Sequence, residues 1–314
     1  MKKVYLSIFI GIIALSATAQ SDSAAAKPWQ WSGLYSASMT QTSLTNWAAG
    51  GNNNININGL FKQLGIYKKG HWTWNNLLEA NFGYNFQPGL NNKTDDRLEY
   101  STRLDRQLGE SKWSASAFAN FRSQFADGFS NPEDTVRIST WLAPAYVTYG
   151  IGATYKPREG FSVYISPITV KQTFVVDSAL FNGNQFFDAT SADAVNINTL
   201  SNGGGYRTEM GAYIDIFYTK SFEEKFEINS RLNLFSNYLD RPQNIDVNWE
   251  TIFLVKVYSY LTVSLQLQLI YDHDVNVRYA GDVPTADGAF NAPGTQFKQI
   301  LGVGVAYAFG EYKK

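Results

Sequence analysis

The last regular stretch of the chain alternates apolar residues with small or polar ones. From Thr295 to Phe309 the sequence reads TQFKQILGVGVAYAF. Alternation with a period of two over this length predicts a long β-strand with one apolar face. One face contains Gln299, Leu301, Val303, Val305, Tyr307 and Phe309, and the other contains Lys298, Ile300, Gly302, Gly304, Ala306 and Ala308.

The same period of two recurs along most of the chain. Between Arg97 and Leu108, charged and polar residues at odd positions alternate with an even-numbered face that includes Leu98, Tyr100, Leu104 and Leu108 and is broken by Arg106. Pro167 interrupts another such segment, and because proline cannot donate a ladder hydrogen bond, we expect a bulge there that shifts the alternation. The pattern predicts twelve strands, at about 31–44, 54–67, 72–86, 96–108, 113–125, 144–156, 161–176, 206–219, 226–240, 245–257, 261–274 and 295–309.

The connections between these segments alternate in length. Tight charged turns such as Lys68–His71 and Gly109–Lys112 are followed by longer connections such as Gln87–Asp95 and Asp177–Gly205. A barrel that crosses a membrane shows this rhythm, with short turns at one end and long loops at the other. Such a barrel must be closed, because an open sheet edge in lipid leaves backbone groups unpaired at several kcal/mol each. The sequence therefore predicts an all-β fold, a closed antiparallel up-and-down transmembrane β-barrel.

The tryptophans lie near the ends of the predicted strands. Such segregation is expected of the two aromatic belts at membrane interfaces, whereas a soluble β-sandwich gives no reason for it. Toward the short turns lie Trp29, Trp31, Trp72, Trp74 and Trp113, and toward the long loops lie Trp47, Trp141 and Trp249.

The end of the last strand indicates how the barrel closes. Gly304, Tyr307 and Phe309 have the spacing seen in terminal strands that the barrel-assembly machinery recognises. We expect this strand to pair with the first one and so to close the sheet. The expected partners are this machinery during insertion, then outer-membrane lipid and lipopolysaccharide.

The first residues read as a secretory signal peptide. An apolar run from Val4 to Leu15 follows a basic start, and Ala17 and Ala19 precede a cleavage point at Gln20. The apolar run is too short to span a bilayer as a helix. The expected location is therefore the bacterial outer membrane. The predicted divisions are a signal peptide at 1–19, a periplasmic leader at 20–30, the single barrel at 31–309 and a tail at 310–314.

Composition narrows the possible chemistry. The chain has no cysteine, which excludes lipoprotein acylation, disulfides and thiolate metal sites. The net charge of −1 argues against a nucleic-acid binder, because no basic stripe is available to neutralise phosphates. Acidic residues in the long loops lack the spacing of a calcium loop, so solvated loops are the preferred interpretation. We therefore expect no cofactor and no metal.

Five short motifs stand out along the chain: TNWAAGGN at 45–52, YKKG at 67–70, TDDR at 94–97, FRSQF at 121–125 and APAY at 143–146. Together they resemble a Bacteroidota outer-membrane β-barrel family of unknown function, domain of unknown function 3078. The resemblance extends over essentially the whole mature chain. It implies a barrel in a Bacteroidota-type envelope and supplies no activity.

Charged residues of both signs fall on the predicted inward faces. They could line a polar pore that filters solutes, or they could form a salt-bridged core that plugs the barrel. Eight-stranded barrels are filled by side chains and those of sixteen to eighteen strands keep a channel, so twelve lies between. Balanced charge and long side chains favour a plugged or narrow lumen, in which most charged groups are paired with each other or hydrated. The predicted lumen charge network is Glu79, Arg97, Glu99, Arg103, Asp105, Arg122, Arg207, Glu209, Asp215, Glu227, Arg231, Glu250 and Lys256.

Two further sites are candidates for function. Around His273, the Asp-His-Asp sequence could activate water, but adjacent strand residues point to opposite faces, so we assign no catalytic residue. An outer hairpin with Asn46, Trp47, Gly50 and Gly51 is either a tight turn with a belt tryptophan or a docking point for a partner or for lipopolysaccharide.

These observations predict a non-enzymatic outer-membrane barrel with a narrow or plugged, charge-paired lumen. Its expected role is structural, accessory or partner-binding, with an envelope protein as partner. The first alternative is a passive channel for small polar solutes. The second is a surface hydrolase at His273.

Overall fold

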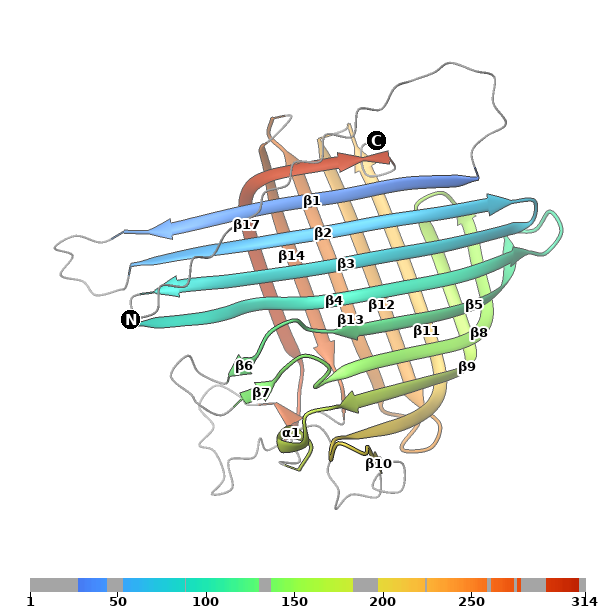
Figure 1. Cartoon of the computed structure of the whole chain (residues 1–314). Coiled ribbons are helices and arrows are strands. Elements are labelled where there is room, and N and C mark those ends of the chain that lie inside the picture. Colours follow the sequence, from blue (N-terminus) through green and yellow to red (C-terminus); the bar gives the residue numbers. More distant parts are fainter. Residues whose placement is uncertain are drawn as a thin grey trace.

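The computed structural model describes residues 28–43, 53–87, 89–129, 137–182, 197–223, 225–258, 261–273, 276–277 and 292–310. Twelve strands form a closed antiparallel barrel, as predicted (Figure 1). They are β1 (Trp29–Thr42), β2 (Asn54–Lys69), β3 (Trp72–Gln87), β4 (Leu90–Gln107), β5 (Trp113–Ser123), β8 (Ala145–Arg158), β9 (Phe161–Val175), β11 (Gly205–Phe222), β12 (Phe226–Asn237), β13 (Ile245–Lys256), β14 (Leu261–Tyr271) and β17 (Gln296–Phe309).

Each barrel strand pairs with its neighbours along the chain, so the topology is up-and-down. The ring closes where β17 pairs with β1, from Gly33 opposite Phe309 to Ser38 opposite Gly304. The closing role predicted for the terminal strand is therefore confirmed. A short strand, β10 (Ile197–Thr199), also pairs with β11 beside the ring.

The two ends of the barrel differ. At the short-turn end, tight turns join β2 to β3, β4 to β5, β8 to β9, β11 to β12 and β13 to β14, and here β1 begins and β17 ends. The opposite, long-connection end carries the small elements (Figure 1). No helix among the described residues is long and apolar enough to cross a membrane. The small elements there are β6 (Gly128–Phe129), β7 (Arg137–Ser139), α1 (Ser178–Asn182), β15 (Asn276–Val277) and β16 (Ala292–Pro293).

The predicted loop from Gln87 to Asp95 is wrong. β3 continues to Gln87 and β4 already begins at Leu90, with Gly89 at a positive φ of 81° that permits a tight turn. The register shifts between Gly83 and Tyr84, which pair with Asp95 and Lys93, so one residue of β4 is bulged out. This bulge interrupts the alternation and hides the start of the strand in the sequence.

The bulge expected at Pro167 is confirmed. On the β8 side Ile151 pairs with Ile168 and Ala153 pairs with Ile165, so β9 has gained a residue between them. Even positions such as Tyr164 are buried before the bulge, and odd positions such as Thr169 are buried after it. The inward face of β9 therefore changes parity at the proline.

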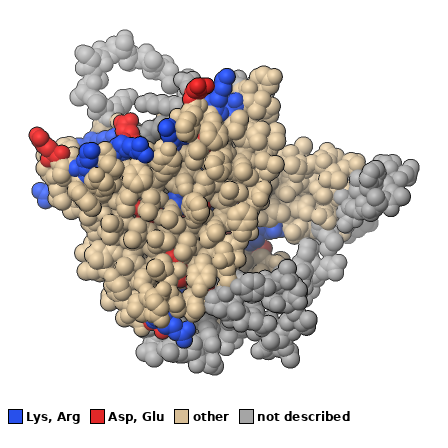
Figure 2. Space-filling view, turned by 180° about the vertical axis from the view of Figure 1, so that it is seen from behind, with Lys and Arg blue, Asp and Glu red and all other residues tan. Residues whose placement is uncertain are grey.

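The barrel is apolar outside and polar inside. Large apolar side chains such as Ile151, Leu301 and Tyr307 are exposed on the outer face, while Glu79 and Glu209 are buried. Figure 2 shows a flank with few charged side chains, and most of the visible charges gather along the upper rim. This distribution of apolar and polar side chains is the reverse of that in a soluble protein and is typical of a barrel surrounded by lipid.

Exposed tryptophans lie toward both ends of the strands. Trp31, Trp72 and Trp113 are exposed near the short-turn end, and Trp141 and Trp249 are exposed toward the long-connection end. Trp47 lies outside the described residues. The described tryptophans therefore occupy the positions that two interfacial belts require.

We expect Gly304→Ala to weaken the closing seam. A Cβ at this position would lie 2.1 Å from the Ala37 carbonyl oxygen, and such overpacking costs about 1–3 kcal/mol. The urea midpoint of unfolding, followed by tryptophan fluorescence, should fall. Gly59→Ala is the matched control, because the nearest atom to its Cβ would be 3.8 Å away. Equal midpoints for the two variants would contradict a tightly packed seam.

Candidate functional site

An ion pair crosses the lumen between β4 and β13, which stand opposite each other in the ring. Arg97 donates through Nη2 to Oε1 of Glu250 at 3.1 Å, and Nη1 bonds the second carboxylate oxygen. Both side chains are largely buried. A two-pronged guanidinium–carboxylate pair combines strength with fixed geometry. It therefore ties the two opposite walls together.

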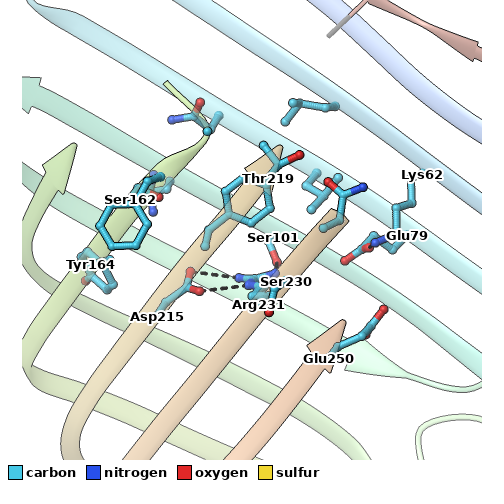
Figure 3. A pocket seen from close by; sticks show the side chains of 18 of the residues that line it. Lys62, Glu79, Ser101, Ser162, Tyr164, Asp215, Thr219, Ser230, Arg231 and Glu250 are labelled. Atoms are coloured by element: carbon cyan, nitrogen blue, oxygen red, sulfur yellow. Dashed lines mark hydrogen bonds and ion pairs between the residues drawn. The ribbon is translucent and has the colours of Figure 1, made fainter. Parts of the chain in front are cut away.

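A second bridge crosses the lumen at Arg231 in β12. Its Nε donates to Asp215 Oδ1 at 3.1 Å and its Nη2 donates to Oδ2 at 3.2 Å (Figure 3). The same guanidinium lies 3.8 Å from Glu99 and 3.5 Å from the Ser101 hydroxyl, both in β4. Arg231 thus links neighbouring β11 to the distant wall.

Four aromatic rings pack beside these ion pairs. Phe118 in β5 stacks on Tyr213 in β11 with ring centroids 4.8 Å apart, and Tyr164 in β9 meets Phe118 edge-on at 5.0 Å. Phe235 in β12 completes the buried cluster. Aromatic rings in such arrangements hold each other firmly, so this side of the lumen is filled.

Two cavities flank the rings. The larger, of about 220 Å³, includes Phe118 and Tyr164 in its lining and extends toward the short-turn end. The smaller, of about 110 Å³, includes Tyr213 and Phe235 and extends toward the long-connection end. The aromatic cluster therefore forms a partition between the two cavities.

A charged cluster surrounds Lys171 on the long-connection side. Its ammonium lies 2.7 Å from Asp246 and 3.6 Å from both Glu209 and Asp272. Arg207 also donates to Glu209 at 3.2 Å. Lys171 is absent from the predicted network, because the bulge at Pro167 moved it to the inward face.

A second cluster of polar side chains lies on the short-turn side, where the Asp105 carboxylate accepts several hydrogen bonds. Its carboxylate accepts bonds from Ser116 at 2.6 Å, Asn75 at 3.0 Å, Thr154 at 3.1 Å and Arg103 Nε at 3.2 Å. Several donors on one buried carboxylate stabilise its charge. Arg103 and Asp105, both members of the predicted set of lumen charges, thus pair with each other.

Two more lysines that the predicted network lacks form ion pairs in the lumen. Lys62 pairs with Glu79, which is directly opposite it in the register of β2 and β3. Lys298 in β17 lies 2.9 Å from Asp95 in β4. Both lysines lie on faces whose period-two pattern is visible in the sequence, so strict application of the pattern would have found them.

Three residues of the predicted network make no direct ion pair with a residue that the structure describes. Arg122 lies over the Tyr146 ring at 4.6 Å, where a cation–π contact replaces a carboxylate. Glu227 accepts a bond from Asn229 at 2.7 Å. Lys256 is the third, at the short-turn end of β13.

Apolar side chains pack against part of the small-residue face of β17. Leu34 from β1 packs with Ile252 and Leu254 from β13, and Ala306 and Leu60 lie against this cluster. Gly302 is buried. Apolar side chains from β1, β2 and β13 thus pack against Ala306 on this face of β17.

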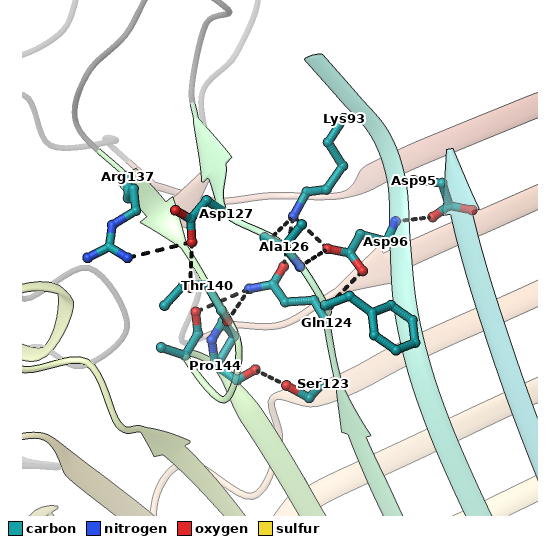
Figure 4. A network of polar contacts seen from close by, with 12 residues as sticks. Lys93, Asp95, Asp96, Ser123, Gln124, Ala126, Asp127, Arg137, Thr140 and Pro144 are labelled. Atoms are coloured by element: carbon teal, nitrogen blue, oxygen red, sulfur yellow. Dashed lines mark hydrogen bonds and ion pairs between the residues drawn. The ribbon is translucent and has the colours of Figure 1, made fainter. Parts of the chain in front are cut away.

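A polar network fixes the connection between β5 and β8 over the long-connection end (Figure 4). Asp96 accepts bonds from the backbone N–H groups of Phe125 at 2.7 Å and Ala126 at 2.9 Å. Gln124 donates to the Ala143 carbonyl at 3.2 Å. Three of the quoted motifs, TDDR, FRSQF and APAY, therefore meet in one network.

The arrangement considered around His273 is not assembled in the described residues. The ring nitrogens of His273 lie 3.3 Å from the Tyr271 hydroxyl and 3.4 Å from Arg241, while the neighbouring Asp272 carboxylate lies near Lys171. The described structure thus pairs His273 with no carboxylate or serine. The hairpin residues Asn46, Trp47, Gly50 and Gly51 and the cleavage residues Ala17, Ala19 and Gln20 lie outside the described residues.

We expect Glu250→Gln to destabilise the barrel strongly. The change removes the carboxylate that bonds the buried Arg97 guanidinium, and breaking a buried pair in this way costs about 3–5 kcal/mol. Urea unfolding should show a lower midpoint. The double variant Arg97→Met/Glu250→Leu removes both charges and should recover much of the loss. An undiminished midpoint for Glu250→Gln would show that the bridge does not hold the walls together.

Three solved structures resemble this fold distantly. An outer membrane channel from Pseudomonas putida F1 has 12% identity and a TM-score of 0.39, covering 91% of this chain and 97% of that one. The translocator domain of autotransporter NalP from Neisseria meningitidis has 10% identity and a TM-score of 0.32, covering 90% and 88%. The TodX monoaromatic hydrocarbon channel (deltaS2 mutant) has 10% identity and a TM-score of 0.27, covering 90% and 83%. No curated protein matches the chain.

One family model matches part of the sequence. It is the protein family of unknown function DUF3078, and the match covers residues 39–129. Four of the five quoted motifs lie inside this segment, whereas APAY at 143–146 lies beyond it. Over the segment that runs from the end of β1 to β6, the chain is similar to a family whose function is unknown.

Proposed function

We propose that this protein is a non-enzymatic β-barrel of the bacterial outer membrane whose narrow lumen is closed by paired charges. The apolar outer face and the closed ring support a lipid environment, since neither an open edge nor a polar flank is tolerated there. In this setting the short-turn end faces the periplasm. The signal peptide at 1–19, the cleavage point before Gln20 and a Bacteroidota-type origin belong to the same proposal.

The observation that carries the closed lumen is the bridge between Arg97 and Glu250. These residues come from strands on opposite sides of the ring, so their contact leaves no free width between them. Beside them, Arg231 reaches Glu99 from a different pair of strands. Together with the four-ring cluster, these side chains occupy the middle of the barrel.

The role that fits a closed barrel best is structural or accessory, exerted through an envelope protein partner. Support comes from the long-connection end, where Asp96, Gln124 and Arg137 hold connecting segments in place with several bonds. Fixed surface segments bind a partner at a smaller loss of entropy than free ones. Lipopolysaccharide and lipid would contact the flank, and the assembly machinery would read Gly304, Tyr307 and Phe309.

The alternative is a passive channel for small polar solutes. The two cavities favour it, because one extends from each end toward the partition. Movement of the side chains between the cavities would then join them. Arg122, which makes no ion pair in the described structure, lines the smaller cavity on this path.

Planar-bilayer recording of the purified full chain tests the closed lumen. We expect no stable conductance steps from the unaltered protein, because ion pairs and rings fill the middle of the barrel. The triple variant Arg97→Ser/Phe118→Ser/Glu250→Ser should show steps, because it joins the two cavities and removes both charges of the bridge together. Arg106→Ser/Glu110→Ser is the matched control, since both residues are exposed and lie outside the lumen.

Stable steps from the unaltered protein would overturn the closed lumen and favour the passive channel. In that case Arg122→Gln should change the selectivity between anions and cations. If neither the unaltered protein nor the triple variant conducts, and circular dichroism shows that the triple variant is folded, then the named side chains are not what closes the lumen.

A further inference from the structure

A groove lies on the outer face of the barrel at the short-turn end. It has a volume of about 600 Å³ and spans β2, β3 and β4, where the β2–β3 and β4–β5 turns lie side by side (Figure 1). The strand residues of its lining alternate with lumen-facing residues such as Asn75 and Asp105, so the groove is separate from the lumen. The lining consists of Tyr67, Lys69, Gly70, His71, Trp72, Trp74, Leu104 and Arg106.

The strand register arranges this lining in two rows that run across the strands. The rim row, next to the turns, consists of Lys69, Trp72 and Arg106, which stand opposite one another in β2, β3 and β4. The second row is the next outward-facing one and consists of Tyr67, Trp74 and Leu104. Cations at the edge of the barrel therefore give way to apolar surface one step toward its middle.

The aromatic rings of the groove are held in place. The Trp74 indole N–H donates to the Thr102 hydroxyl at 2.8 Å. The Trp29 ring of β1 packs against the rings of Tyr67 at 5.3 Å and Trp74 at 5.7 Å. Trp72 and Trp74 still expose 45% and 40% of their surface. A ligand thus meets a preformed surface, which it binds at a small loss of side-chain entropy.

The charge of the groove is positive. Lys69 and Arg106 are both exposed, and none of the described lining residues is acidic. The Arg106 guanidinium lies over the Trp72 ring, 5.6 Å from its centroid. Because Lys69 and Arg106 lie on the two strands beside Trp72, their backbones are roughly 10 Å apart. One phosphate between these long side chains can accept bonds from both.

The arrangement of a cation beside an outward ring recurs at the short-turn end. Arg158 lies 6.0 Å from the Phe161 centroid, and Lys220 lies 4.6 Å from the Phe222 centroid. Positive charge at a membrane boundary attracts anionic headgroups. Among the described residues of this end, the exposed acids are Glu110, Glu159 and Glu223, and the exposed cations are Lys68, Lys69, Arg106, Lys112, Lys156, Arg158, Lys220 and Lys225.

We propose that the groove binds one anionic phospholipid of the periplasmic leaflet. The phosphate lies at the rim row between Lys69 and Arg106, and an acyl chain passes Trp74 and Leu104 toward the apolar flank. Cations at the edge, rings at headgroup level and apolar surface beyond them follow the order of the parts of a lipid. The inference rests on the proposed function, which places the short-turn end at the periplasm, and adds the site and the class of lipid.

Native mass spectrometry of the full chain, released from detergent micelles, tests the proposal. Dioleoyl phosphatidylglycerol and dioleoyl phosphatidylcholine are added at equal concentration, so that the two lipids differ only in the headgroup. We expect the first retained lipid to be phosphatidylglycerol by at least about 10-fold, because two neighbouring cations favour a net negative headgroup. Equal retention of the two lipids would overturn the proposal. Tighter retention of lipid A than of phosphatidylglycerol would overturn the choice of a phospholipid.

Variants locate the retained lipid. Lys69→Gln/Arg106→Gln should remove the preference for phosphatidylglycerol. The matched control Lys112→Gln/Lys225→Gln removes the same charge from the same end outside the groove, and should keep the preference. An unchanged preference in the groove variant, or an equal loss in the control, would contradict the assigned site.

The outcome is independent of the lumen, since the groove lies on the outer face. Conductance in planar bilayers would overturn the closed barrel and leave the lipid preference as it is. Absence of the lipid preference would overturn this site and leave the closed barrel as it is.

Discussion

A strand that crosses lipid must satisfy its backbone hydrogen bonds within the sheet, and the rest of this structure depends on how the ring meets that requirement. The closing seam between β1 and β17 is short, running only from Gly33 opposite Phe309 to Ser38 opposite Gly304. By contrast, β1 pairs with β2 along its whole length from Trp29 to Thr42. Beyond the seam, Lys298 ties β17 across the lumen to Asp95 of β4. The strand that closes the ring therefore also helps to close the lumen.

Closure and alternation together decide what lies inside. Because every second side chain of each strand points inward, the pattern that gives an apolar exterior also places charges in a confined space. A buried charge is tolerated there when a partner is in reach. At the width of this ring, Arg97 and Glu250 can form an ion pair from opposite strands. Arg231 can form ion pairs with Asp215 and Glu99 at the same time. The middle of the barrel is thus filled because a ring of twelve strands is narrow enough for charged side chains from opposite walls to pair.

The sequence predicted the strands and their faces well, because a period of two is a local property. It predicted the bulge at Pro167 for the same reason, but not the one opposite Gly83 and Tyr84, where no proline or glycine marks the bulged residue in β4. The charge network was predicted as a set of inward residues. Its pairings were not predictable, since a face assignment does not say which distant strand a side chain reaches. Lys171 was missed because the parity change at Pro167 was not carried forward along β9.

The middle of the lumen is filled by two chemically different groups of side chains, the aromatic partition and the ion pairs beside it. On one side the rings of Phe118, Tyr164 and Tyr213 pack against each other, and separating them exposes apolar surface to water. On the other side Arg97 pairs with Glu250 and Arg231 pairs with Asp215, and water can replace part of these ion-pair contacts when the space widens. Any opening of this barrel should therefore begin on the ionic side, between β4 and β13, while the aromatic side of β5, β9 and β11 stays packed.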